Sequence, residues 1–423
     1  MSIFTRPFQE TTLNFSKTCL ANVWHYSSFE WFSLFLVLIL VFFWFISPVF
    51  SLIPITLFLA FVSTPRYVKL FFVFLMALSL GLVNYTKFPE SDLASYYYWF
   101  KLFSQMPLID FNKVRLVDPV FYFPTAVLAH IFSGFGPAFI LFWTTVIYML
   151  AFCAIIEFSE AVKLKSRWAI FIVFYVAFIG LGFAMTSHLV RQYTAGAFLL
   201  YGLSREVCKK RGAYLFFLLA PFVHFSTAVF LPVILLFKFA DFTIRKNVIV
   251  ISCLFLISLI VGMFNLFSFS EFMPRSNILF LNYLFDKANN YTERDAGIIS
   301  WRQMFEYIVI YVFFISVFMK DLKNRGKYKK IFIFNTLYIC LLLLFRNTSM
   351  LLVRFYIFCI PFSITMLPSL AKNKSPIIYL FMIVLLITAP IRFFRLLEMT
   401  EWRFIENSYE IIFCSIIDFL SFI

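Results

Sequence analysis

The chain has 423 residues, of which 62% are hydrophobic and only 13% are charged, and a soluble protein would have no surface able to hold so much apolar material. The formal net charge of +15 would suggest a nucleic-acid partner in a soluble protein, but the Lys and Arg residues stand mostly in short clusters between apolar runs. Composition therefore excludes a soluble domain and a nucleic-acid-binding protein, and it indicates a protein whose main solvent is lipid.

Apolar runs long enough to cross a bilayer recur along the whole chain. A helix needs about 20 residues to cross roughly 30 Å of hydrocarbon, and lipid admits only helices or closed barrels. The runs lack the two-residue alternation of a barrel, so we expect an all-α polytopic membrane bundle of about 11–14 spans. The expected spans are 29–47, 49–63, 67–86, 136–161, 168–187, 190–207, 247–267, 303–319, 331–345, 351–368 and 376–391.

Basic clusters between the spans orient the chain, because Lys and Arg favour cytoplasmic loops. We expect 1–28 to be a cytoplasmic or interfacial segment, 29–391 a single transmembrane domain, and 392–423 an amphipathic or short membrane segment. The two longest polar loops, about 87–118 and 268–302, then lie on the external face. The clusters placed inside are Arg66/Lys69, Lys163/Lys165/Arg167, Lys209/Lys210/Arg211, Arg245/Lys246, Lys320 to Lys330, and Lys372/Lys374.

Two segments, 119–133 and 213–238, break the simple alternation of sides and are expected to be helices broken near the middle of the membrane. In the second segment, Pro221 and His224 interrupt the apolar run, which predicts two half-length arms that enter and return. Such breaks are tolerated where they line an enclosed or watery cavity.

Arginines near the external ends of spans are the first candidates for a binding site. Arg191 defies the positive-inside preference, so we expect it to face an anion, with snorkelling to the interface as the alternative. Arg354 lies inside the span that follows Arg346, and two guanidiniums converging on one cavity would suit a pyrophosphate.

The remaining candidates are two acids, a histidine and a tyrosine. His224 could transfer a proton or only bond the carbonyls freed by the helix break. Asp92 and Tyr96 are four residues apart, so one helical face could hold a sugar, and Asp118 before Pro119 could be a helix cap. The sequence has no P-loop, HExxH or metal-ligand cluster, so we expect no metal and no soluble cofactor.

The candidate segments together resemble the Wzy-like polysaccharide polymerases of the EpsG type. They occur in family order over roughly 80–370, although Asp118 stands where the family often has Glu. The resemblance implies a GT-C-like helical fold on the outer side of the bacterial inner membrane. The matching segments are Asp92/Tyr96, Asp118 to Phe121, Arg191-Gln192, Phe222 to Ser226, and Arg354-Phe355-Tyr356.

The resemblance further implies a metal-independent glycosyltransferase of O-antigen or other exopolysaccharide biosynthesis. It would move a glycan from undecaprenyl-pyrophosphate to the acceptor sugar of another lipid-linked repeat unit, and a chain-length regulator is an expected partner. The expected catalytic residues are His224, Asp92, Arg191 and Arg354, and the expected substrate-binding residues are Tyr96, Asp118, His188, Gln192, Arg346 and Tyr356.

Two alternatives stay open at this point. A flippase of lipid-linked oligosaccharide would also need cations in a cavity, but its polar residues should spread through the full depth of the central helices. Here they gather towards one face, which favours an enzyme. An O-antigen ligase uses similar donors and chemistry, and only the order of the segments argues against it.

Overall fold

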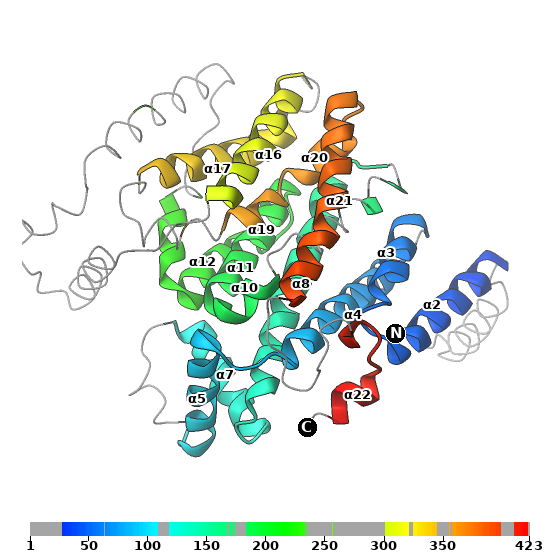
Figure 1. Cartoon of the computed structure of the whole chain (residues 1–423). Helices are drawn as coiled ribbons and strands as arrows, with labels where there is room; N and C mark the ends of the chain where they lie inside the picture. Colours follow the sequence, from blue (N-terminus) through cyan, green and yellow to red (C-terminus); the bar gives the residue numbers. More distant parts are fainter. Residues whose placement is uncertain are drawn as a thin grey trace, which may run out of the picture.

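All regular elements in the described part of the chain are helices, as a computed structural model shows (Figure 1). The expectation of an all-α fold is therefore confirmed for these residues. The structure describes residues 28–62, 64–108, 118–165, 167–168, 170–171, 173, 183–232, 234, 256, 301–320, 325–344, 355, 358–398 and 410–421.

The first eight helices are α2 Ser28–Ile46, α3 Leu52–Phe61, α4 Arg66–Tyr85, α5 Ser91–Gln105, α7 Pro119–Ile131, α8 Gly136–Ala161, α10 Phe183–His188 and α11 Val190–Val207. Of these eight, all but α5 lie within or close to the apolar segments expected from the sequence, and α10 covers only the end of the expected span 168–187. The later elements are α12 Ala213–Val223, the 3-10 helix η1 Phe225–Val229, α16 Trp301–Lys320, α17 Arg325–Leu344, α19 Cys359–Ser363, α20 Leu367–Lys372, α21 Pro376–Glu398, η4 Glu410–Ile412 and α22 Ile416–Ser421.

Two helices of the described part, α4 and α8, are both long and apolar enough to cross a membrane. Shorter apolar helices accompany them, among them α3, α7 and α12. This set is consistent with a membrane protein. The expected span 247–267 lies outside the described residues apart from Leu256, as does most of 168–187.

The centre of the molecule is built on α8, which packs against α4 and α11, and α11 packs in turn against α12. Polar bonds join these apolar surfaces. The side-chain amide of Asn84 on α4 donates to Thr144 on α8 at 3.0 Å and to Thr186 on α10 at 3.1 Å. Because Asn84 is fully buried, these bonds replace water and fix how α4, α8 and α10 meet.

The two segments expected to be broken helices behave differently. In the second, α12 ends at Val223, His224 is extended (φ −155°, ψ 116°), and η1 follows, so a break at His224 is confirmed. In the first, α7 runs continuously through Pro124, so the expected break in 119–133 is wrong. A short helix of 13 residues can carry one proline by giving up one backbone hydrogen bond.

Two further expectations need correction. The region 87–118, expected to be a loop, contains the helix α5. α5 packs closely on α8 because Gly136 of α8 has no side chain: a Cβ added there would lie 2.6 Å from the ring of Tyr97 on α5.

The expected span 351–368 is interrupted between α19 and α20, because Pro368 lacks an N–H and starts a new helix. The other expected loop, 268–302, lies outside the described residues up to Trp301.

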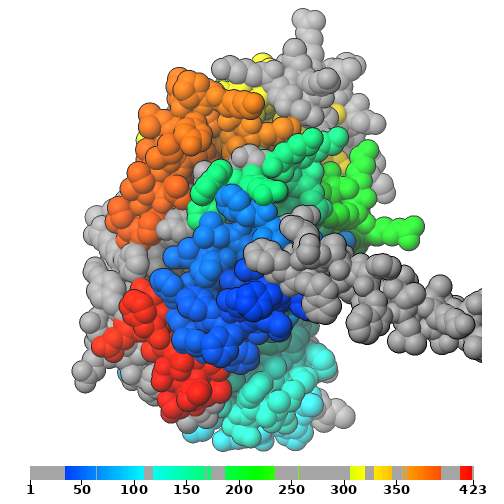
Figure 2. Space-filling view, turned by 90° about the vertical axis from the view of Figure 1, so that its right-hand side faces the viewer, coloured from blue at the N-terminus to red at the C-terminus, as the bar shows by residue number. Residues whose placement is uncertain are grey.

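The C-terminal part packs on the N-terminal helices. The Ser47 hydroxyl donates to the Ile412 carbonyl at 2.7 Å, and the rings of Phe50 and Phe413 stack with centroids 6.3 Å apart. Figure 2 shows this red segment lying against the blue helices. Contacts between 412–413 and the turn after α2 thus attach part of 392–423 to the bundle.

Candidate functional site

The candidate site is centred on Arg191, in the first turn of α11. Its Nη1 donates to Asp118 Oδ2 at 2.8 Å and its Nε donates to the Tyr96 hydroxyl at 3.2 Å. The Asp118 side chain is only 2% exposed, whereas that of Arg191 is 30% exposed. The buried acid therefore holds the arginine in place, and the arginine is the partner that a ligand can reach.

Two aromatic rings complete the surroundings of the guanidinium. Its central carbon lies 5.9 Å from the ring centroid of Tyr96 on α5 and 5.5 Å from that of Tyr122 on α7. The Tyr96 ring also stacks on Phe139 of α8 at 5.3 Å between centroids. Cation–π contacts of this kind favour the charged group without using its hydrogen-bond donors. Within the described residues, Nη2 of Arg191 meets no acceptor, so this donor can serve an anion.

Asp118 occupies the N-cap position of α7 in the left-handed conformation (φ 62°, ψ 50°), yet its side chain makes no capping bond. Its two oxygens serve other partners: Oδ2 accepts from Arg191, and Oδ1 accepts the backbone N–H of Phe225 at 3.1 Å. Capping alone therefore does not explain Asp118. Asp tolerates the left-handed region better than most residues, and here that backbone turns the carboxylate away from its own helix.

His224 lies at the break after α12, next to the same carboxylate. Its Nδ1 is 3.7 Å from Asp118 Oδ2, and its side chain is 18% exposed. Its backbone carbonyl accepts from the N–H of Thr227 at 3.0 Å and from the Thr227 hydroxyl at 2.9 Å. The break thus places an imidazole and the freed N–H of Phe225 around one buried acid.

A second polar group follows α4. Lys87, only 2% exposed, donates from Nζ to Ser187 Oγ at 2.7 Å and lies 2.9 Å from His188 Nε2. Burial lowers the pKa of Lys87 to about 8, although the charge of Glu90 opposes this. Burial and the Lys87 charge both lower the pKa of His188, against the charges of Asp92 and Glu90. A lysine that titrates near neutral pH can bind an anion or exchange a proton.

The structure brings together some of the residues expected from the sequence and separates others. Tyr96, Asp118, Arg191 and His224 form the Arg191 centre, and His188 belongs to the Lys87 group. Asp92 is exposed on α5, one turn before Tyr96, and its charge acts on His188. The other expected site residues are Gln192, which is 1% exposed, and Arg346, Arg354 and Tyr356, which lie outside the described residues.

Tyr122 and Lys87 belong to these two polar groups but were not predicted from the sequence. Tyr122 lies four residues after Asp118, so the two share one face of α7, which is a pattern the sequence already holds. Lys87 is a lone cation beyond the outer end of an expected span, the same signal that selected Arg191. Among the described residues, no group of three or more His, Cys, Asp or Glu side chains is placed to hold a metal ion.

Comparison with known protein families gives a match over most of the chain. The model of the EpsG family matches residues 69–405, a stretch that includes every residue of both polar groups. No curated protein and no solved structure matches the sequence. Because the family match covers most of the chain, the chain belongs to the EpsG family, which is associated with exopolysaccharide biosynthesis.

Proposed function

We propose that this protein is a polysaccharide polymerase of the O-antigen type in the bacterial inner membrane. It transfers a glycan from undecaprenyl-pyrophosphate to the acceptor sugar of another lipid-linked repeat unit, on the external side. The observation that carries the proposal is a partly exposed guanidinium held by a nearly inaccessible carboxylate and two tyrosines. A cation fixed in this way needs little reorganisation to stabilise a pyrophosphate as it leaves.

In the proposed reaction, the hydroxyl oxygen of the acceptor sugar attacks the anomeric carbon of the donor and forms the glycosidic C–O bond. The bond between that carbon and the pyrophosphate oxygen breaks, and its electron pair stays on the pyrophosphate. Arg191 stabilises this developing charge through Nη2, which meets no acceptor among the described residues. Lys87, which is only 2% exposed, would act on the pyrophosphate through its positive charge and not through direct contact.

The acceptor hydroxyl must also lose its proton, and we assign this step to His224. Asp118 Oδ2 lies 3.7 Å from Nδ1 and would stabilise the imidazolium that forms. Asp92 is the other candidate base, but it is exposed and lies outside the Arg191 centre. Tyr96 and Tyr122 would hold the glycan beside the arginine, since sugar rings pack on aromatic faces while hydroxyls bond polar groups.

Reconstitution in lipid vesicles tests the proposal. The purified chain receives undecaprenyl-pyrophosphate-linked repeat units, and lipid-linked products of wild type and Arg191→Ala are separated on a gel. A ladder from wild type that disappears in the variant supports a polymerase. Movement of labelled lipid-linked sugar across the bilayer with no ladder would instead make the protein a flippase, and transfer onto lipid A core would make it a ligase.

A further inference from the structure

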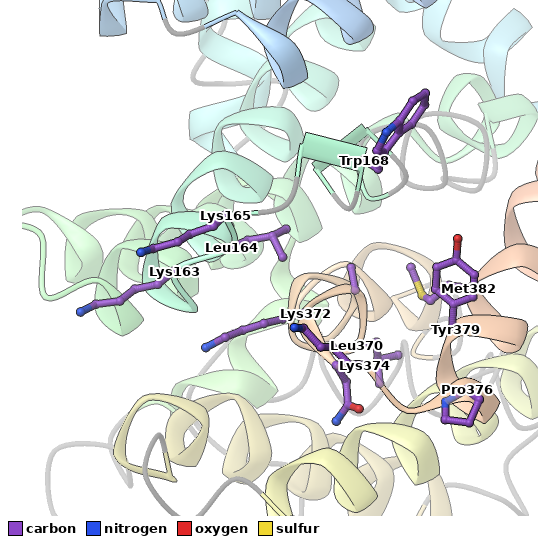
Figure 3. A pocket seen from close by; sticks show the side chains of 12 residues that line it. Lys163, Leu164, Lys165, Trp168, Leu370, Lys372, Lys374, Pro376, Tyr379 and Met382 are labelled. Atoms are coloured by element: carbon purple, nitrogen blue, oxygen red, sulfur yellow. The ribbon is translucent and has the colours of Figure 1, made fainter.

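A pocket of about 700 Å³ lies between the end of α8 and the start of α21, away from both polar groups described above. Two short segments carry its charge: Lys163 and Lys165 follow α8, while Lys372 ends α20 and Lys374 lies in the link to α21. Figure 3 shows lysine side chains from both segments on one side of the pocket, with Trp168 and Tyr379 on the other.

The charge of this pocket is uncompensated within the described residues. None of its four lysines forms an ion pair there, although neighbouring lysines do: Lys210 lies 2.9 Å from a Glu160 oxygen, and Lys330 pairs with Glu206. Like charges that face one cavity repel each other, so an anion between them is favoured. Lys210 and Lys330 thus each have a carboxylate partner, whereas the four lysines of the pocket have none among the described residues and are left for an outside anion.

The opposite wall of the pocket is apolar and continues into an exposed surface. Trp168 and Tyr379 are 62% and 59% exposed, as expected of aromatic side chains at the boundary between water and lipid. From the mouth of the pocket, Ile377, Leu380, Val384, Ile387 and Ile391 recur along α21 at intervals of three and four, and all are exposed. At 1.5 Å per residue this stripe is about 20 Å long, which exceeds one leaflet of a hydrocarbon core roughly 30 Å thick.

We propose that the pocket binds the phosphate headgroup of an anionic phospholipid of the cytoplasmic leaflet, with the acyl chains lying along the exposed stripe of α21. A free phosphate would satisfy the lysines but leave the adjoining stripe unused, and an acidic soluble protein would meet a surface that faces hydrocarbon. The proposal depends on the orientation given above and not on polymerase activity, so it stands apart from the chemistry at Arg191.

The test uses the full-length chain in detergent, titrated with phosphatidylglycerol or phosphatidylcholine and followed by native mass spectrometry. Two double variants each remove both positive charges that one segment contributes to the pocket: Lys163→Gln/Lys165→Gln and Lys372→Gln/Lys374→Gln. Lys209→Gln/Arg211→Gln is the matched control, because it removes the same charge from another exposed cytoplasmic cluster. From the worth of two lysines near an anionic surface, each pocket variant should bind phosphatidylglycerol roughly 30-fold more weakly, while the control matches wild type.

Three results would overturn the proposal: equal weakening in all three variants, equal affinity of the wild type for both lipids, or displacement of phosphatidylglycerol by inorganic phosphate at millimolar concentration. A thermal-unfolding series guards against misfolded variants, since all four proteins should melt alike in phosphatidylcholine. Added phosphatidylglycerol should then raise the melting temperature of wild type and control only, because a ligand stabilises only a chain that binds it. A rise in the pocket variants as well would contradict the assignment.

Discussion

Two arginines on the same helix, α11, sit in similar surroundings and differ in what they leave unused. Arg205 lies 3.6 Å from the buried carboxylate of Glu157, donates to the Tyr201 hydroxyl at 3.0 Å, and lies over the Tyr201 ring. Arg191 has the same three kinds of partner. However, Nε and Nη2 of Arg205 both donate to the carbonyl of Arg211, whereas Nη2 of Arg191 has no such partner in the described part of the chain.

The buried acids that hold these two arginines, Glu157 and Asp118, also differ in how many cations surround them. Glu157 is surrounded by Arg66 at 4.0 Å, Arg205 at 3.6 Å and Lys210 at 3.2 Å, and Ser204 also donates to it at 3.0 Å. These cations around one buried acid join α4, α8 and α11, so Glu157 is matched by charges from the chain itself. An arginine beside a buried acid is therefore no sign of a binding site by itself, and the unused donor is what distinguishes Arg191.

The sharpest test of this comparison is the pair Arg191→Ala and Arg205→Ala. Losing a fixed donor to a developing charge costs about 100- to 1,000-fold in rate, so Arg191→Ala should nearly abolish the product ladder. Arg205→Ala should keep the wild-type rate per folded molecule. Arg191→Ala leaves the buried charge of Asp118 without its arginine partner, which should destabilise the fold. The double variant Asp118→Asn/Arg191→Ala removes that charge and should recover stability without recovering activity. If Arg191→Ala and Arg205→Ala lose activity equally, the unused Nη2 donor does not distinguish a catalytic arginine from a structural one, and the comparison is wrong.

Glu157→Gln should lower stability and leave catalysis intact. The amide cannot balance three cations, and a lost hydrogen bond to a charged group costs about 2 kcal/mol. Denaturant or thermal unfolding in detergent measures this loss, and the ladder assay at equal folded protein measures the rate. A rate loss as large as that of Arg191→Ala would place Glu157 in the active machinery and contradict the comparison.

Tyr122→Leu should weaken activity about fivefold, because a partly desolvated cation–π contact contributes about 1 kcal/mol. Tyr122→Phe keeps the ring and should match wild type. The matched change at the other end, Tyr201→Phe, loses only a hydroxyl bond from Arg205 and should also keep the rate. If Tyr122→Phe is as weak as Tyr122→Leu, the hydroxyl matters and the ring contact does not.

The smallest expected effect is a pH dependence confined to the Lys87 group. Lys87 is a cation below its pKa of about 8 and neutral above it, so affinity for a pyrophosphate analogue should fall as pH rises through about 8. Since its pKa in the folded chain is below the ordinary 10.5, folding favours the neutral form, and Lys87 destabilises the chain least at high pH. Lys87→Arg stays charged and should flatten the binding profile. A profile that persists unchanged in Lys87→Arg would assign the titration to another group.

Some site residues were predictable from the sequence because their local signals are strong. Arg191 stands against the charge bias of its span end, and His224 stands beside Pro221 in an interrupted apolar run. Others needed the structure. Asp118 resembles an ordinary helix cap in the sequence, but in the structure it makes no capping bond, and its carboxylate accepts from Arg191 and from the Phe225 N–H.

The sequence by itself determined the helical class, the position of several apolar helices and the break at His224, because these depend on local composition, residue periodicity and proline. It did not determine that α5 packs on α7, nor that Arg191 and Phe225, which follow Asp118 by 73 and 107 positions, would share its carboxylate. Those contacts depend on which faces of distant helices meet. That choice is made by packing, through close approaches such as Gly136 on Tyr97 and buried bonds such as those of Asn84, which no local pattern encodes.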